Sequence, residues 1–323
     1  MKLSDFNYKL PTNKIAKFPA VPRDSSKLLV LDKQTGHITD DHFLNLANYL
    51  KAGDLLVRNN TKVIPARIYG KKQTGGKVEV LLTKKTSNSD STETWECLTK
   101  PGIKPGQKIF FSPLPSKNKN ELVAKCVSQN NKTYTRELEF NQMGPKFVEI
   151  LEKIGITPLP PYIADTTKDS DYIRKKYQTI YAKFDGSAAA PTAGLHFTKS
   201  LEKRLETKGV EIAEVTLHVG LGTFLPVKTN NILEHHMHSE WFEVTRQTAD
   251  KINKTIASLA ILVKISPFCF LIKNPIISPN YNKDTNQDIL NLFLLKISQN
   301  FKTKLSKCML LNLTLIISQW LSI

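Results

Sequence analysis

Six short apolar runs at regular spacing between residues 67 and 141 constrain the fold more than any other feature of this sequence. The runs are RIYGKK, KVEVLLTKK, TWECLTKP, QKIFFS, ELVAKCVSQ and TYTRELEF. Gly-Gly at 75–76 and Pro-Gly at 101–102 and 105–106 separate several of them. Short strands divided by turn residues at this spacing are typical of a small β-barrel or sandwich. The sequence therefore predicts an all-β unit over residues 67–141.

The segments on either side of this unit predict alternating strands and helices. Strands are expected at 27–32, 54–60 and 210–220, and helices at 42–51, 146–155 and 198–209. Strands that alternate with helices indicate an α/β arrangement. The predicted fold class is therefore α+β or α/β. We expect a mixed-sheet α/β domain, formed by residues 1–66 and 142–254, that is interrupted by a small β-barrel insertion at 67–141.

The C-terminal segment differs from the rest of the chain in composition. All 14 glycines lie before residue 251, and residues 251–323 contain neither glutamate nor arginine. A typical glycine usage of roughly 7% would place about five glycines in a segment of this length. Leucine and isoleucine occur there in runs without a helical or strand period and without turn residues between them. We predict that residues 255–323 are an aberrant tail, such as the product of a frameshift.

The charge and the cysteine content bound the class of protein. A formal net charge of +17 favours a polyanionic partner such as nucleic acid, although a lysine-rich composition also fits an AT-rich coding sequence. The four cysteines are scattered without metal-ligand spacing, which indicates a reducing compartment. The N-terminus has no apolar signal-peptide core, and lysines and prolines interrupt the apolar stretch 256–277. We expect a cytoplasmic protein without a membrane span.

Two stretches place small residues around a histidine. They are GSAAAPTAGLHFT, which contains Gly194 and His196, and HVGLGTFLPV, which begins with His218 and contains Gly220 and Gly222. Small side chains allow a ligand to approach the backbone, and N–H groups at a helix entry can hold an anion. The spacing does not match a dinucleotide-binding fingerprint. The alternative interpretation is that these histidines are buried and serve only packing.

A third stretch, EHHMHSE at 234–240, is the densest histidine cluster of the chain. Histidine and glutamate are common zinc ligands, so a metal site is one interpretation. The stretch lacks the i, i+4 histidine pair of a zinc helix, and no cysteine lies nearby, so acid–base chemistry or substrate binding is the better hypothesis. In RNNTKVIPAR at 58–67, the arginines suit contact with a phosphate or carboxylate, or else form a solvated strand end.

Long stretches of the chain, taken in order, resemble the S-adenosylmethionine:tRNA ribosyltransferase-isomerase family of the queuosine pathway. The resemblance extends from residue 3 to about residue 254. The matching stretches are LSDFNYKLP, IAKFPAVPRDSSKLLVLD, GDLLVRNNTKVIPARIYGKKQTGGKVEVLL, PLPPYI, YQTIYAKFDGSAAAPTAGLHFT, VTLHVGLGTFLPV and HHMHSEWFEV.

The resemblance implies an activity. The family moves the ribosyl part of S-adenosylmethionine to 7-aminomethyl-7-deazaguanine at the wobble position of tRNA and isomerises it. Epoxyqueuosine-tRNA, adenine and methionine are the products. The resemblance also implies that S-adenosylmethionine is a consumed substrate, that no cofactor or metal is needed, and that a cytoplasmic monomer acts on tRNA with a GUN anticodon.

Such a reaction needs a base near the 5′ carbon, an acid for the departing adenine and groups that hold the substrates. We hypothesise that His196, His218 and Glu240 are the acid–base residues. Arg23 and Arg67 would hold a carboxylate or phosphate, and Tyr177 and Gln178 could contact a base. The other residues expected to bind substrate are Thr192, Gly194, Gly220, Gly222 and His238.

The chain departs from the family after about residue 255. The glycine-containing strand and the later motifs that the family carries are missing from the printed sequence. This departure leaves an inactive remnant, or a protein that only binds tRNA, as the alternative function. A histidine-rich metallohydrolase is a third possibility, which a measurement of metal content would separate.

Overall fold

The structure is a computed structural model, and it describes residues 2–272 with gaps. The gaps are 17, 32–34, 89–90, 112–121, 132–133, 161–162, 164–169, 221–228, 232–233, 235–239, 258–261 and 266–268. Within the described part of the chain, no helix combines the length and the apolarity that crossing a lipid bilayer requires.

Six antiparallel strands close into a barrel in the middle of the chain, in the spatial order β10-β7-β6-β5-β8-β9. The strands are β5 (Arg67–Lys72), β6 (Lys77–Asn88), β7 (Glu93–Lys100), β8 (Lys108–Phe111), β9 (Leu122–Asn130) and β10 (Thr135–Phe140). Every strand corresponds to one of the six apolar runs. The barrel forms because alternate side chains along these strands are apolar and point inward, where they make one continuous core.

Helix α1 (Gly144–Ile154) packs against the barrel core. Its buried residues Phe147 and Leu151 lie one helical turn apart on the same face and join the barrel cluster. The ring of Phe147 lies 5.0 Å from that of Phe140 and 6.1 Å from that of Trp95. The helix ends at Ile154, one residue before the end of the predicted range 146–155.

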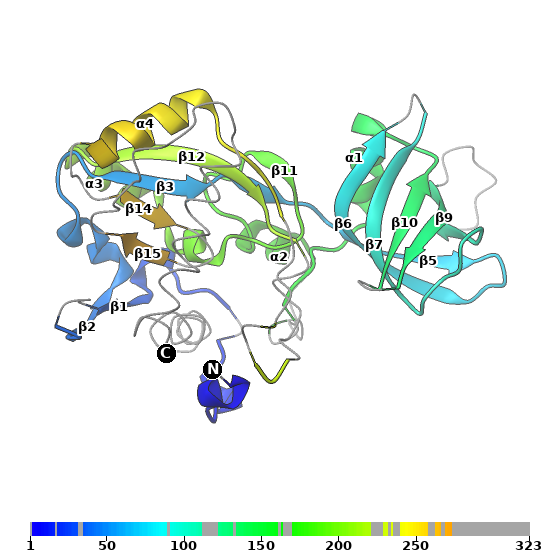
Figure 1. The fold of residues 1–323 in the computed structure, drawn as a ribbon, viewed down its shortest axis with the longest axis horizontal. Coiled ribbons are helices and arrows are strands. Elements are labelled where there is room, and N and C mark those ends of the chain that lie inside the picture. The colour runs from blue at the N-terminus through cyan, green and yellow to red at the C-terminus, as the bar shows by residue number, and fades with distance from the viewer. Residues whose placement is uncertain are drawn as a thin grey trace.

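A five-stranded mixed sheet, in the order β13-β12-β3-β14-β15, forms the centre of the second unit. Its strands are β3 (Leu55–Asn59), β12 (Glu211–His218), β13 (Trp241–Glu243), β14 (Leu262–Ile265) and β15 (Cys269–Ile272). The three inner strands run parallel, and the two edge strands run antiparallel to their neighbours. Figure 1 shows this sheet beside the barrel. The predicted fold class, a mixed-sheet α/β domain interrupted by a β-barrel, is confirmed.

Helices cover both faces of this sheet. Leu56 of β3 packs with α3 (Lys199–Thr207) and with the 3-10 helix η4 (Phe43–Tyr49). Leu55 and Val57 point to the other face and pack with Ile252 of α4 (Arg246–Ala257). Neighbouring residues of a strand point to opposite faces, so an uninterrupted apolar run in β3 is what a sheet covered on both sides needs.

Two small paired elements complete the second unit. Strands β1 (Lys27–Leu31) and β2 (Ile38–His42) form an antiparallel pair, and β4 (Thr61–Val63) runs parallel to β11 (Phe184–Ser187). The remaining elements are η1 (Leu3–Phe6), η2 (Thr12–Lys14), η3 (Arg23–Ser25), α2 (Ser170–Lys176) and η5 (Thr192–His196).

The helix predicted at 42–51 is a 3-10 helix rather than an α-helix. Its buried residues Phe43 and Leu46 are three positions apart, which matches the three residues per turn of a 3-10 helix. Asp41 accepts hydrogen bonds from the side chains of Asn45 and Tyr49 at 2.7 and 2.5 Å. These contacts hold this short segment in its tighter winding.

Most of the predicted C-terminal tail, including all of residues 273–323, lies outside the described residues. The part that is described extends the central sheet. Strand β14 pairs in parallel with β3, and β15 pairs with β14. The predicted domain boundaries stay a prediction.

Candidate functional site

The two stretches of small residues lie side by side. The backbone N–H of Ala188 donates to the carbonyl of Val219 at 3.0 Å. The Ser187 hydroxyl accepts from the Val219 N–H at 2.9 Å and lies 2.7 Å from the Ala189 carbonyl. Ile64 joins them through its N–H, which donates to the Ser187 carbonyl at 3.0 Å. Segments far apart in sequence therefore meet at the end of β4.

His218 is held on several sides at the end of β12. Its Nδ1 lies 2.8 Å from Oγ1 of Thr61, the first residue of β4. Its ring stacks on Trp241, with 4.7 Å between centroids and 17° between planes. Burial lowers the pKa of His218, while the carboxylates of Asp185 and Glu243 act in the opposite direction. The imidazole is thereby fixed in place and favoured in its neutral form.

Gly186 lies against the ring of His218. A Cβ atom at position 186 would fall 2.7 Å from Cε1 and Nε2 of that ring. The backbone of Gly186 has φ +145°, a conformation that side-chain-bearing residues rarely adopt. Both the space and the backbone angle therefore require glycine at this position.

Glu240 contacts Gly220, which follows β12. Its Oε1 accepts a hydrogen bond of 2.8 Å from the backbone N–H of Gly220. Glu240 is half-buried and lies next to Trp241, so its carboxylate belongs to the same region as His218. Gly222 and His238, both predicted to bind substrate, lie outside the described residues.

His196 is the last residue of η5, and residues near the N-terminus hold its ring in place. Its Nδ1 lies 2.9 Å from Oγ of Ser26, and its ring lies 5.3 Å from that of Phe43. Burial lowers the pKa of His196 to about 4, although a hydrogen bond to the backbone of Arg23 acts in the opposite direction. This histidine is therefore neutral at physiological pH.

The tight turn that precedes His196 depends on Gly194. A Cβ atom at position 194 would overlap the hydroxyl of Tyr181 and would fall 2.9 Å from Cγ2 of Thr179. Thr192 begins the same 3-10 helix and is half-buried. The small residue at 194 therefore accommodates a neighbouring side chain of the protein.

Arg23 donates its hydrogen bonds to backbone carbonyls. Its Nη1 bonds to Gln178 at 2.6 Å and to Leu195 at 3.4 Å, and its Nη2 bonds to Lys176 at 3.0 Å and to Lys175 at 3.2 Å. These bonds join the end of α2 to the residue before His196. The geometry thus makes Arg23 part of the scaffold that positions His196.

Gln178 and Tyr177 belong to the same scaffold. The Gln178 side chain bonds to both backbone groups of Val63, accepting from the N–H at 3.1 Å and donating to the carbonyl at 2.7 Å. Tyr177 is buried in a small cluster with Val63, Ala190 and Leu195. Strand β4 therefore carries Thr61, which contacts His218, and Val63, which is bonded to the scaffold of His196.

Arg67 lies apart from these groups, at the first residue of barrel strand β5. Its Nε lies 3.3 Å from a carboxylate oxygen of Glu79, and its backbone pairs with Ile156. Its predicted contact with substrate stays a prediction, as do those of the other predicted site residues. Among the described residues, no three histidine, cysteine or acidic side chains group in a way that could hold a metal ion.

The chain matches a protein-family model over residues 3–265, and the family is described as queuosine biosynthesis protein. The chain belongs to the queuosine biosynthesis protein family. The S-adenosylmethionine:tRNA ribosyltransferase-isomerase of Carboxydothermus hydrogenoformans is 51% identical over 256 residues, which are 79% of this chain and 71% of that protein. The protein of the same name from Thermosipho melanesiensis is 50% identical over 257 residues, with the same coverage. The predicted family and its enzyme class are thereby confirmed.

A solved structure of S-adenosylmethionine tRNA ribosyltransferase from Thermotoga maritima is also similar. It is 29% identical and covers 80% of this chain, and the match spans 68% of that chain with a TM-score of 0.34.

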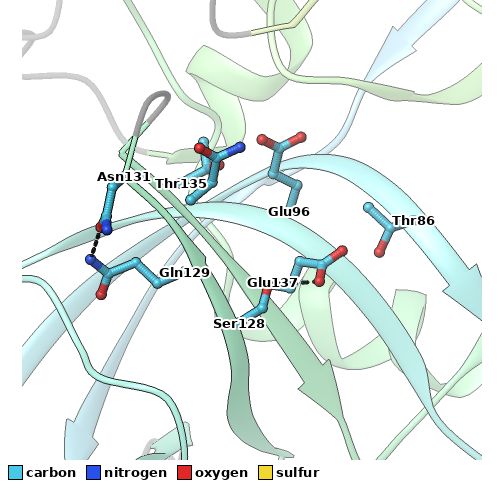
Figure 2. Close-up of a pocket in the computed structure, with 8 residues that line it drawn as sticks. Thr86, Glu96, Ser128, Gln129, Asn131, Thr135 and Glu137 are labelled. Atoms are coloured by element: carbon cyan, nitrogen blue, oxygen red, sulfur yellow. Dashed lines mark hydrogen bonds between the residues drawn. The ribbon is translucent and has the colours of Figure 1, made fainter.

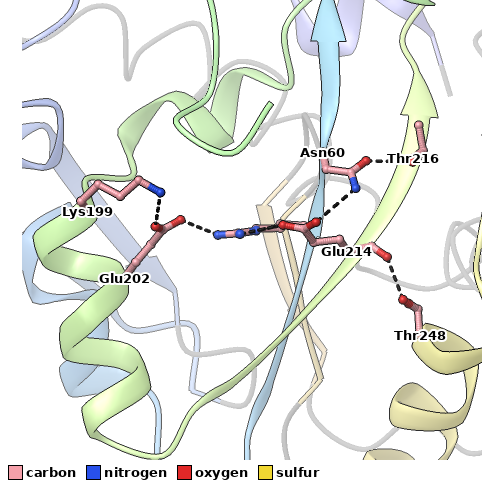
Figure 3. Close-up of polar contacts among 7 residues, drawn as sticks. Asn60, Lys199, Glu202, Glu214, Thr216 and Thr248 are labelled. Carbon is pink, nitrogen blue, oxygen red and sulfur yellow. Dashed lines mark hydrogen bonds and ion pairs between the residues drawn. The ribbon is translucent and has the colours of Figure 1, made fainter. Parts of the chain in front are cut away.

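In this member of the queuosine biosynthesis family, Arg58 forms a part-buried network with carboxylates of the same chain. Its guanidinium pairs with Glu202 of α3 and, at 2.7 Å, with Glu214 of β12. Figure 3 shows these two carboxylates with Lys199 and Asn60. Asn60 donates to Glu214 at 3.2 Å, and the guanidinium lies 4.0 Å above the ring of Tyr181. Arg58 thus bonds to carboxylates of its own chain, where the sequence suggested an external phosphate or carboxylate.

The barrel of this family member carries a polar pocket that the site does not use, drawn in Figure 2. It is lined by Thr86, Glu96, Ser128, Gln129, Asn130, Asn131, Thr135 and Glu137. Ser128 donates to Glu137 at 2.7 Å within it.

Sequence reasoning missed four residues that shape the site of this family member: Ser26, Thr61, Gly186 and Trp241. Each lies inside a stretch that resembles the family, but no local pattern marks its role. The signal that could have found Gly186 is the run of small residues that it begins.

Proposed function

We propose that the chain is an S-adenosylmethionine:tRNA ribosyltransferase-isomerase. It moves the ribosyl moiety of S-adenosylmethionine to 7-aminomethyl-7-deazaguanine at the wobble position of tRNA, giving epoxyqueuosine-tRNA, adenine and methionine. The observation that carries this proposal is the 51% identity, over 71% of its length, to a relative that bears this name.

The arrangement of His196, His218 and Glu240 supports chemistry of this kind. The proposed reaction removes a proton beside the sulfonium and releases adenine, so it needs groups that accept and donate hydrogen near neutral pH. Burial lowers the pKa of both histidines, which favours neutral rings at neutral pH. Glu240 adds a half-buried carboxylate that bonds to Gly220, two residues after His218.

The substrate-binding residues are part of the same proposal. Gly220 and Gly222, with Thr192, Gly194 and His238, would let a nucleoside approach the backbone. Arg67 would reach the phosphates of tRNA from the start of the barrel, where its guanidinium is partly exposed. We propose that Arg23, Tyr177 and Gln178 act indirectly, because their contacts with the scaffold hold η5 and β4 in place.

S-adenosylmethionine would serve as a consumed substrate, without a resident cofactor or metal. The tRNA would carry a GUN anticodon, and its wobble base would leave the stack to reach the site. The net charge of +17 suits such a partner. We propose that the chain acts as a cytoplasmic monomer and that a chelator leaves its activity unchanged.

The test is adenine release by the full chain from S-adenosylmethionine. One tRNA carries 7-aminomethyl-7-deazaguanine at the wobble position, and the control tRNA carries guanine there. Adenine release with the modified tRNA alone is the expected result. A second candidate, tRNA binding without turnover, is favoured by the family match ending at residue 265 of 323. Folded protein that binds tRNA but releases no adenine would support this second candidate, and protein that does neither would overturn both.

A further inference from the structure

The contact between Thr61 and His218 indicates which nitrogen of the imidazole carries the proton. Thr61 is fully buried, and its hydroxyl has one O–H to donate. Within the described residues, the only hydrogen-bond partner of Oγ1 is Nδ1 of His218, at 2.8 Å. A buried donor without an acceptor costs about 1–3 kcal/mol, more than an unused lone pair does.

This cost decides between the two neutral tautomers. If Nδ1 carried the proton, it would donate to Oγ1, and the Thr61 O–H would have no acceptor among the described residues. If Thr61 donates to Nδ1, the single donor of the buried hydroxyl is satisfied and the proton lies on Nε2. His218 is only half-buried, so water can accept from Nε2–H, whereas the Thr61 hydroxyl is fully buried. The second arrangement is therefore the more stable one.

The rest of the environment keeps the ring in this orientation. The backbone of Gly186 lies against the ring, close to Cε1 and Nε2, and Trp241 stacks at 4.7 Å. The nearby charges are Asp185 on β11 and Glu243 on β13, and Asp185 is itself paired with Lys62 at 3.0 Å. No hydrogen bond to Nε2 forms within the described part of the chain.

We propose that His218 works as a neutral hydrogen-bond donor, which offers Nε2–H to a substrate atom that gains negative charge, and that Thr61 is the positioning residue that fixes this tautomer. The proposal rests on the proposed function and deepens it. A preorganised donor stabilises developing charge without reorganising at the moment of reaction, and losing such a donor costs about 10²–10³-fold in kcat. His218 in this tautomer is no general base, because Nδ1 is occupied by the Thr61 hydroxyl.

The first experiment reads the tautomer directly and needs no turnover. Protein labelled with ¹⁵N at histidine is examined by NMR at neutral pH, and the His218 signals are assigned by their loss in His218→Gln. We expect a protonated Nε2 and an unprotonated Nδ1. Thr61→Val should abolish this preference, and Thr61→Ser should restore it. A proton on Nδ1, or a charged ring at neutral pH, would overturn the proposal even if the protein proves inactive.

The second experiment tests what the donor does. The glutamine amide nitrogen lies about as far along the side chain as Nε2 of histidine, and it donates but cannot act as a base. His218→Gln should therefore retain at least a tenfold higher kcat than His218→Ala. Thr61→Val should lower kcat by at least tenfold with little change in KM, because a misdirected group loses transition-state stabilisation. Equal kcat values for the folded Gln and Ala variants would contradict the proposal.

Thr248→Val is the matched control for Thr61→Val. Thr248 is also a buried threonine whose hydroxyl donates one hydrogen bond, of 2.9 Å to the Glu214 carbonyl, but it lies on α4 and does not contact His218. Thr248→Val should change the free energy of unfolding about as much as Thr61→Val does, while leaving the His218 ¹⁵N signals and kcat unchanged. Loss of activity in this control equal to that in Thr61→Val would mean that the effect is one of folding alone.

Discussion

Oγ of Ser26 lies 2.9 Å from Nδ1 of His196, although 170 positions separate the two residues in sequence. The contact joins the loop after η3 to the end of η5 and fixes the ring of a histidine whose pKa burial lowers to about 4. A buried neutral histidine has consequences for stability as well as for chemistry.

We expect His196 to make the fold sensitive to acid. Between pH 6.5 and about 4, the unfolded chain protonates at this position and the folded chain does not, so stability falls as the pH is lowered through this window. The full effect is about 3 kcal/mol. Urea unfolding across this window should show a weaker acid dependence for His196→Gln than for the native chain. His37→Gln, at an exposed position, is the control, and an equal acid dependence in both variants would contradict the assignment.

Arg23 should matter for stability more than for substrate affinity. Replacing it by lysine keeps the charge but removes the fork that bonds to four carbonyls, so we expect Arg23→Lys to lower the free energy of unfolding by about 1–3 kcal/mol. The KM for S-adenosylmethionine should change little at a temperature where the variant is folded. A stable variant with a greatly raised KM would instead make Arg23 a direct substrate ligand.

The part-buried Arg58 pairs should be costly to break. Arg58→Met removes the guanidinium that Glu202 and Glu214 share and leaves them only their contacts with Lys199 and Asn60, which should lower the free energy of unfolding by about 3–5 kcal/mol. Adding Glu214→Gln to Arg58→Met should recover part of that loss, because Glu214 then carries no charge that lacks a cationic partner. Lys153→Met breaks the exposed pair with Glu149 and should cost less than about 1 kcal/mol. Similar losses of unfolding free energy in Arg58→Met and Lys153→Met would contradict this prediction.

Gly194 should tolerate no side chain while Tyr181 is present. Gly194→Ala places a methyl group onto the Tyr181 hydroxyl, so we expect a loss of about 1–3 kcal/mol. Tyr181→Phe makes space, and the two changes together should cost less than the sum of the single changes. Gly76→Ala, where the nearest atom lies 4.0 Å away, is the control. Strict additivity in thermal or urea unfolding would show that the two residues do not clash.

Local patterns in the sequence were sufficient to predict the barrel and the helices α1 and α3. Turn residues and alternating side chains mark each barrel strand, because both act over a few neighbouring residues. Helix α3 begins where the sequence places it, since the Thr198 hydroxyl accepts from the Leu201 N–H within one turn at 3.2 Å. The 3-10 winding of η4 was not predictable, because it depends on which face meets the sheet and on the bonds to Asp41.

The sequence by itself determined the family, the fold class and the stretches in which the site lies. Only the tertiary structure decided what each side chain contacts: Arg23 bonds to carbonyls, Arg58 bonds to carboxylates of the same chain, and Thr61 bonds to His218 across 157 positions. The physical reason is that secondary structure follows from interactions between near neighbours. The partner of a buried donor is set instead by chain segments that meet only when the fold is complete.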